Sequence, residues 1–164
     1  MASTTLRAVV AAALLGAVAL PGFAGTMVPL KPRSDLDTFY VSVGVAGMQP
    51  EDYLVDTGAG YMTITSETLE RLQQNGGAVR VGQLDGRLAD GTTVRVPVYR
   101  ISEITIGHSC RIHNVDAAVL PGATRGLFGL SALRKASPFQ FSIDPPTLTL
   151  SNCHDIAPEV AAAD

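Results

Sequence analysis

The sequence predicts a single, mostly β domain with one or two short helices. Apolar residues alternate with polar ones in several runs, as at Val41, Val43 and Val45, and such alternation is typical of strands with one buried face. Dipeptides that favour hairpins separate some of these runs. A length of 164 residues with 46% hydrophobic content and no internal repeat fits one domain and argues against a disordered chain.

The first 24 residues have the pattern of a secretory signal peptide. Arg7 precedes an uninterrupted apolar run over 8–20, and small residues at 22–24 provide a cleavage site. A membrane-spanning helix needs about 20 apolar residues, more than this run supplies. We therefore expect a cleaved signal, export, and no membrane span in the mature protein; the alternative is a membrane anchor formed by an uncleaved N-terminus. Residues 25–37 carry prolines and charges without periodicity, which predicts a flexible N-terminal arm.

The predicted domain covers residues 38–150 and is followed by a tail at 151–164. A helix is expected with Ser66 as its N-cap and Gly76-Gly77 as its stop signal, and a second one is expected around 131–135. A protruding hairpin is expected near Asp90-Gly91, with Asp85-Gly86 as the weaker choice for its tip. The expected strands are 38–45, 53–55, 61–65, 92–96, 98–106, 112–120, 139–143 and 147–150.

Composition excludes several functional classes. With a formal net charge of −3 and 5% aromatic residues, the chain lacks the basic surface and stacking side chains of a nucleic-acid binder. The spacing of His108, Cys110 and His113 matches no closed zinc pattern, and no phosphate-binding glycine loop is present, so we expect neither a metal nor a cofactor. Cys110 and Cys153 either form a disulfide in an oxidising compartment or remain separate thiols.

The segment Leu54–Ala59 is the most informative part of the chain. Two apolar residues lead to Asp56 at a strand end, Thr57 follows, and Gly58 permits a tight backbone turn. Some seventy residues later, Leu127 and Phe128 precede Gly129 and a short helix. Taken alone, an Asp-Thr-Gly tripeptide is equally compatible with an ordinary turn between two strands.

This pairing of motifs, with a hairpin between them, resembles the retropepsin-like aspartic proteases, and most closely the single-domain bacterial proteins with a signal peptide or anchor. The resemblance implies a closed β-barrel that forms one acid-protease lobe, and location in the bacterial periplasm. It implies that Asp56 is catalytic and that Thr57 links the active-site loops of two copies. Gly60 departs from the family pattern, because relatives often carry a polar residue at this position after the Asp-Thr-Gly-Ala motif. The resemblance further implies an active-site loop of Thr57, Gly58 and Ala59, a flap at Ala89, Asp90 and Gly91, and a loop-supporting strand at Leu127, Phe128 and Gly129.

A chain of this length holds only one such lobe. Hydrolysis by paired carboxylates requires a base for water and an acid for the carbonyl oxygen, so Asp56 must meet the same residue of a second copy. We therefore expect a homodimeric endopeptidase acting on peptide or protein substrates. Two alternatives remain open: a catalytically inactive module that binds a peptide or protein, and an enzyme that only processes itself. Ser131 lacks the glycine pattern of a nucleophile elbow and is better explained as a helix N-cap.

Overall fold

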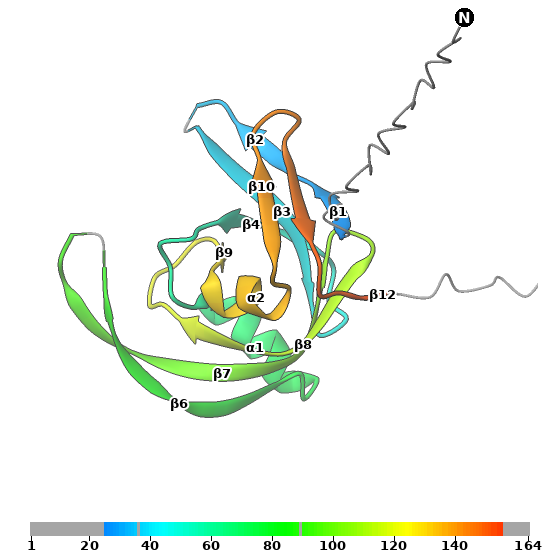
Figure 1. Cartoon of the computed structure of the whole chain (residues 1–164). Helices are drawn as coiled ribbons and strands as arrows, with labels where there is room; N and C mark the ends of the chain where they lie inside the picture. The colour runs from blue at the N-terminus through cyan, green and yellow to red at the C-terminus, as the bar shows by residue number, and fades with distance from the viewer. Residues whose placement is uncertain (1–24, 36, 89, 156–164) are drawn as a thin grey trace, which may run out of the picture.

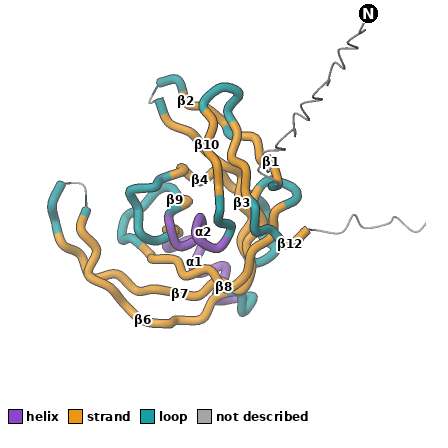
Figure 2. Tube along the Cα trace, viewed as in Figure 1, coloured by secondary structure: helices purple, strands orange, loops and turns teal. Residues whose placement is uncertain are grey.

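The computed structural model describes residues 25–35, 37–88 and 90–155. The expected signal peptide at 1–24, Ala89 of the expected flap, and residues 156–164 of the expected tail lie outside the described residues. Strands dominate the described chain, with two short helices, as Figure 2 shows. The elements in Figure 1 are β1 (Thr26–Pro29), β2 (Lys31–Arg33), β3 (Thr38–Val45), β4 (Glu51–Val55), β5 (Met62–Ile64), α1 (Ser66–Gln74), β6 (Ala78–Arg87), β7 (Thr93–Ile106), β8 (Cys110–Val119), β9 (Leu127–Phe128), α2 (Leu130–Lys135), β10 (Phe139–Ser142), β11 (Thr147–Leu150) and β12 (His154–Asp155).

The larger sheet has the strand order β12-β8-β5-β9-β4-β3-β7-β6, and β2 pairs with β3 at one side. Because β7 also pairs with β8, the pairings close a circuit through β8, β5, β9, β4, β3 and β7. Most neighbours are antiparallel, whereas β4 runs parallel to β9 and β5 runs parallel to β8. These two parallel pairings place chain segments from the first and last thirds of the domain side by side.

Alternation along the strands produces the core. Val41, Val43 and Val45 are almost fully buried, as the pattern of β3 predicts. Strand β7 contributes Ile101, Ile104 and Ile106, all without solvent exposure, and Phe128 of β9 lies among them in the same cluster. Burial of apolar area is the main favourable contribution to folding, so this shared core stabilises the pairing of β9 with β4 and β5, which lie far from it in sequence.

The N-terminal segment differs from the expected flexible arm. Residues 26–29 form β1, which pairs antiparallel with β11 in a separate sheet of order β1-β11-β10. Val28 is 1% exposed and Leu30 is 6% exposed, so apolar burial and a backbone ladder order a segment that has no periodicity of its own. The expectation was wrong because it used only local composition, whereas the partner strand lies more than a hundred residues away.

Details at the ends of other elements also differ from the sequence-based expectations. Helix α1 begins at Ser66, but its N-cap is Thr65, whose hydroxyl accepts a hydrogen bond from the Thr68 amide. Strand β7 is continuous through Pro97, where two strands were expected. In the expected tail, β12 pairs with β8, and Cys153 forms a disulfide with Cys110. Within the described ranges, no helix has the length and apolar character needed to cross a bilayer.

Candidate active site

Asp56 lies at the end of β4, at the start of a tight loop that leads to β5. Its Oδ1 accepts a hydrogen bond from the Gly58 amide at 2.8 Å, and its carbonyl accepts one from the Ala59 amide at 3.3 Å. These bonds fold the loop back onto Asp56 and fix one oxygen of the carboxylate. Asp56 is half-buried and Thr57 is exposed, so the loop presents both side chains at the surface of the single chain.

Strand β9 and the residues after it hold this loop through backbone contacts. The strand pairs parallel with β4 through Leu54 and Leu127, and the Asp56 amide donates to the Phe128 carbonyl at 3.2 Å. At Gly129 the chain passes so close to the loop that an added Cβ would lie 2.2 Å from the Tyr61 carbonyl oxygen. The Leu130 amide donates to the Ala59 carbonyl at 2.8 Å. Leu127, Phe128 and Gly129 thus lie where the sequence analysis expected a supporting strand.

Ser131 is a supporting residue whose role the sequence analysis did not identify. Gly129, not Ser131, is the N-cap of α2, and Ser131 lies in the first turn. Its hydroxyl accepts from the Met62 amide at 2.7 Å and donates to the Asp116 carbonyl at 2.6 Å. It therefore ties the start of β5 to β8. No local pattern could have shown this, because both partners are distant in sequence.

The hairpin expected in this region is formed by β6 and β7. The last ladder pair is Arg87 with Thr93, and the Gly91 amide donates to the Leu88 carbonyl at 2.9 Å. Gly91 has φ +86°, which glycine adopts without strain, and Asp90 caps the turn by accepting from the Thr92 amide. Asp85-Gly86, the weaker choice for the tip, lies inside β6 in register with Arg95 and Val94. In Figure 1 the far end of this hairpin stands at the left of the view.

A cleft of about 670 Å³ lies between the Asp56 loop and the hairpin. Asp56, Gly58, Ala59 and Gly60 line one side, and hairpin residues line the other, most of them apolar with Arg87 as the exception. Among the described residues that line it, Asp56 is the only carboxylate. The hairpin residues are Leu84, Gly86, Arg87, Leu88 and Val96, and the remaining lining residues are Tyr61, Thr63, Ala118, Leu120 and Leu127. The cleft is suited to an extended, largely apolar chain beside one acid.

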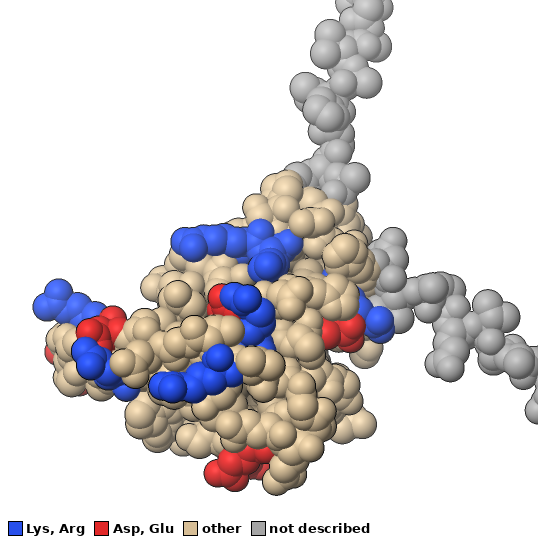
Figure 3. All heavy atoms as spheres, turned by 90° about the horizontal axis from the view of Figure 1, so that it is seen from below, with Lys and Arg blue, Asp and Glu red and all other residues tan. Residues whose placement is uncertain are grey.

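The outer surface of the hairpin is charged. Figure 3 shows acidic and basic side chains together at its end, at the left of the view. Arg95 donates two hydrogen bonds to Asp85 and lowers the pKa of that carboxyl. The Thr92 amide lowers the pKa of Asp90 by hydrogen bonding to its charged form. Across the described ranges, no group of three or more His, Cys, Asp or Glu residues is placed to hold a metal ion.

Comparison with known proteins agrees with this geometry. A family model described as "gag-polyprotein putative aspartyl protease" matches residues 41–135, from β3 through α2. The chain belongs to this family of retropepsin-like aspartic proteases. Among solved structures, the crystal structure of a retropepsin-like aspartic protease from Rickettsia conorii matches with a TM-score of 0.53 and 18% identity. The alignment covers 77% of this chain and 90% of that one, and it shows a shared fold. No curated protein matches the sequence.

Proposed function

We propose that this retropepsin-like protein is an aspartic endopeptidase that acts as a homodimer, with one Asp56 supplied by each copy. The observation that supports the proposal is the cleft that Asp56 shares with the hairpin. It has room for an extended peptide, and Asp56 is the only carboxylate among its described lining residues. One carboxylate cannot act as base and acid in the same step, so a second is required from another copy.

The chemistry follows from two carboxylates within about 3 Å of each other. Both cannot ionise at that distance, so the pair keeps one proton; aspartic proteases are the standard example of this arrangement. The ionised carboxylate takes a proton from water while the water oxygen attacks the peptide carbonyl carbon. The protonated carboxyl gives its proton to the carbonyl oxygen of the peptide. The tetrahedral intermediate then breaks at the C–N bond. The carboxyl that took a proton from water gives it to the leaving nitrogen, and the other carboxylate takes a proton from a hydroxyl of the intermediate, which restores the starting pair. Neither a metal nor a covalent intermediate is needed.

Two features support the dimer and the location. Thr57 and Asp56 lie at the surface of the single chain, where the same loop of a second copy could approach across a two-fold axis. We further propose that the protein is exported to the bacterial periplasm, since residues 1–24 have the signal pattern. The Cys110–Cys153 disulfide is consistent with an oxidising compartment.

The test is cleavage of an unstructured polypeptide by purified protein at mildly acidic pH. Asp56→Asn should abolish cleavage, because an amide cannot deprotonate water. Asp37→Asn is a matched control: Asp37 is exposed, and its φ of 47° is one that asparagine adopts readily. Cleavage that survives Asp56→Asn would disprove the mechanism.

One observation favours a second function, a peptide-binding module without turnover. Gly60 stands where relatives often have a polar residue, and no atom lies within 4 Å of a Cβ built there. The loop is therefore held by its backbone hydrogen bonds and gains no side-chain contact at Gly60. Stoichiometric peptide binding by a strict monomer, with no cleavage in the same assay, would favour this function.

A further inference from the structure

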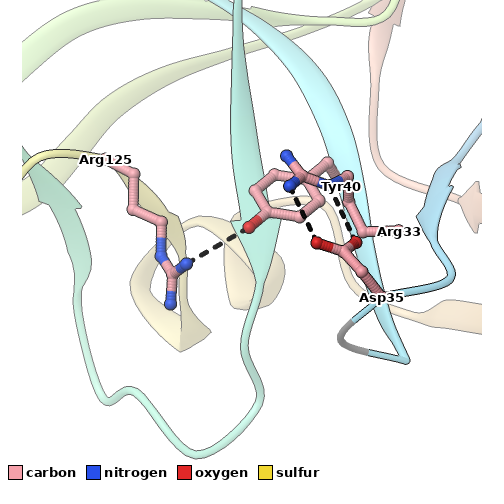
Figure 4. Close-up of polar contacts among 4 residues, drawn as sticks. All are labelled: Arg33, Asp35, Tyr40 and Arg125. Atoms are coloured by element: carbon pink, nitrogen blue, oxygen red, sulfur yellow. Dashed lines mark hydrogen bonds and ion pairs between the residues drawn. The ribbon is translucent and has the colours of Figure 1, made fainter.

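A basic recess includes Arg125, which lies just before β9, the strand that supports the Asp56 loop. It has a volume of about 300 Å³ and is lined by Lys31, Arg33, Tyr40, Asp52 and Arg125. Figure 4 shows Arg125 at the hydroxyl end of Tyr40, and the Arg33 guanidinium carbon lies over the ring, 6.0 Å from its centroid. We call this site the Arg125 recess.

The charges in the recess do not balance. Lys31 pairs with Asp52 at 2.6 Å, and Arg33 pairs with Asp35 through two contacts of 3.2 Å. Among the described residues, Arg125 donates a side-chain hydrogen bond to the Tyr40 hydroxyl at 3.3 Å, and this acceptor carries no negative charge. A guanidinium has five N–H donors, so Arg125 keeps both its charge and most of its donors for a ligand.

Residues that line the recess lie close in the chain, or in strand pairing, to residues of the cleft that contains Asp56. Arg125 lies two residues before Leu127, which lines that cleft, so their Cα atoms are at most about 7 Å apart. Tyr40 pairs with Leu54, two residues before Asp56. A peptide that extends from the cleft along the start of β9 would therefore reach the recess within a few residues.

We infer that the Arg125 recess binds an acidic side chain of the peptide substrate, at a position away from the scissile bond. This inference rests on the proposed function for the identity of the ligand. Arg125 donates a pair of parallel hydrogen bonds to the carboxylate. The Tyr40 hydroxyl accepts from Arg125 and keeps its own proton, which it donates to the same carboxylate. Asp52 and Asp35 neutralise the neighbouring cations, so the recess selects a single carboxylate.

Peptide binding to the Asp56→Asn protein tests this inference without turnover. A neutral, fluorescently labelled peptide is scanned with Glu or Gln at each position in turn, and Kd is measured by anisotropy. At one position, or at two related by the dimer axis, Glu should bind about tenfold more tightly than Gln, as expected for a charge-assisted pair. Arg125→Gln should remove this preference and leave the Kd of the Gln peptide unchanged. Arg80→Gln, an exposed arginine on β6, should keep the preference.

A second test varies the salt concentration and measures peptide binding to protein that keeps Arg125. At 1 M NaCl the Debye length is about 3 Å, so the Glu preference should largely disappear while the Gln peptide binds as before. Equal affinity for Glu and Gln at every position would overturn the inference, and so would an equal loss for both peptides in Arg125→Gln. Binding with a Glu preference but no cleavage by the unaltered protein would count only against the catalytic proposal. Cleavage without any Glu preference would count only against the recess.

Discussion

Substituting Gly129 by alanine probes the close backbone approach between the end of β9 and the Asp56 loop. The added Cβ would lie 2.2 Å from the Tyr61 carbonyl oxygen and 2.8 Å from that of Ala59. Both are backbone atoms, so the loop must move by about 1 Å before these contacts become ordinary. Such a shift breaks the hydrogen bond from the Leu130 amide to Ala59. Gly129 has φ −94°, which alanine adopts without strain, so the cost comes from the contact alone.

The expected loss of stability follows from these terms. Overpacking costs about 1–3 kcal/mol, and the lost hydrogen bond about 1 kcal/mol. Replacing glycine reduces the entropy of the unfolded chain and returns about 0.4–1 kcal/mol. We therefore expect Gly129→Ala to lower the free energy of unfolding by about 1–4 kcal/mol.

Urea unfolding followed by far-UV circular dichroism measures this change, since the chain has no tryptophan for fluorescence. Gly60→Ala is the matched control, because a Cβ at Gly60 meets no atom within 4 Å. It should raise the free energy of unfolding by about 0.4–1 kcal/mol, because it keeps the entropy gain and adds no close contact. Equal unfolding midpoints for the two variants would refute the close approach of β9 to the loop.

Three further predictions concern the support of the site. Ser131→Ala removes the hydrogen bonds of its hydroxyl to the Met62 amide and the Asp116 carbonyl, so the urea midpoint should fall by the equivalent of about 1–3 kcal/mol. An unchanged midpoint would contradict the bridge. Arg95 lowers the pKa of Asp85, so this pair stabilises the hairpin above the ordinary pKa of a carboxyl, about 4, and the contribution is lost as pH falls through the lower folded value. Hydrogen exchange in β6 and β7 should therefore accelerate at pH 3 relative to pH 6, after correction for intrinsic rates. Asp85→Asn should reduce that difference, and the part that remains belongs to Asp90, whose pKa is also lowered. Reducing the Cys110–Cys153 disulfide, which spans 43 residues, should lower the free energy of unfolding by about 4 kcal/mol through chain entropy. A urea midpoint unaffected by reductant would argue against this disulfide in the protein.

Local patterns predicted the parts of the site whose chemistry is local. Asp56 at a strand end and the turn residue Gly91 both have sequence signals, because a tight turn requires particular residue types. The mostly β fold and the family were predicted correctly from the same motifs. Ordered pairing of the N-terminal segment and the bridge through Ser131 had no such signal. Each depends on a partner far along the chain, and one sequence does not show which distant segments meet.

The position of Arg125 is a related case. Its sequence context is an ordinary loop before β9, and its relation to Tyr40 appears only when β3 and that loop are brought together. The proposed site for an acidic side chain therefore depends on a residue that no local motif marks.

The central claim, that two copies share one active site, is tested most directly by mixing experiments. Active protein is equilibrated with a tenfold excess of Asp56→Asn protein, well above the dimer dissociation constant, and cleavage is measured at constant active protein. If each site needs one Asp56 from each copy, most active chains enter mixed dimers, and the rate should fall to about one tenth. An unchanged rate would show that a single chain is sufficient and would contradict the account.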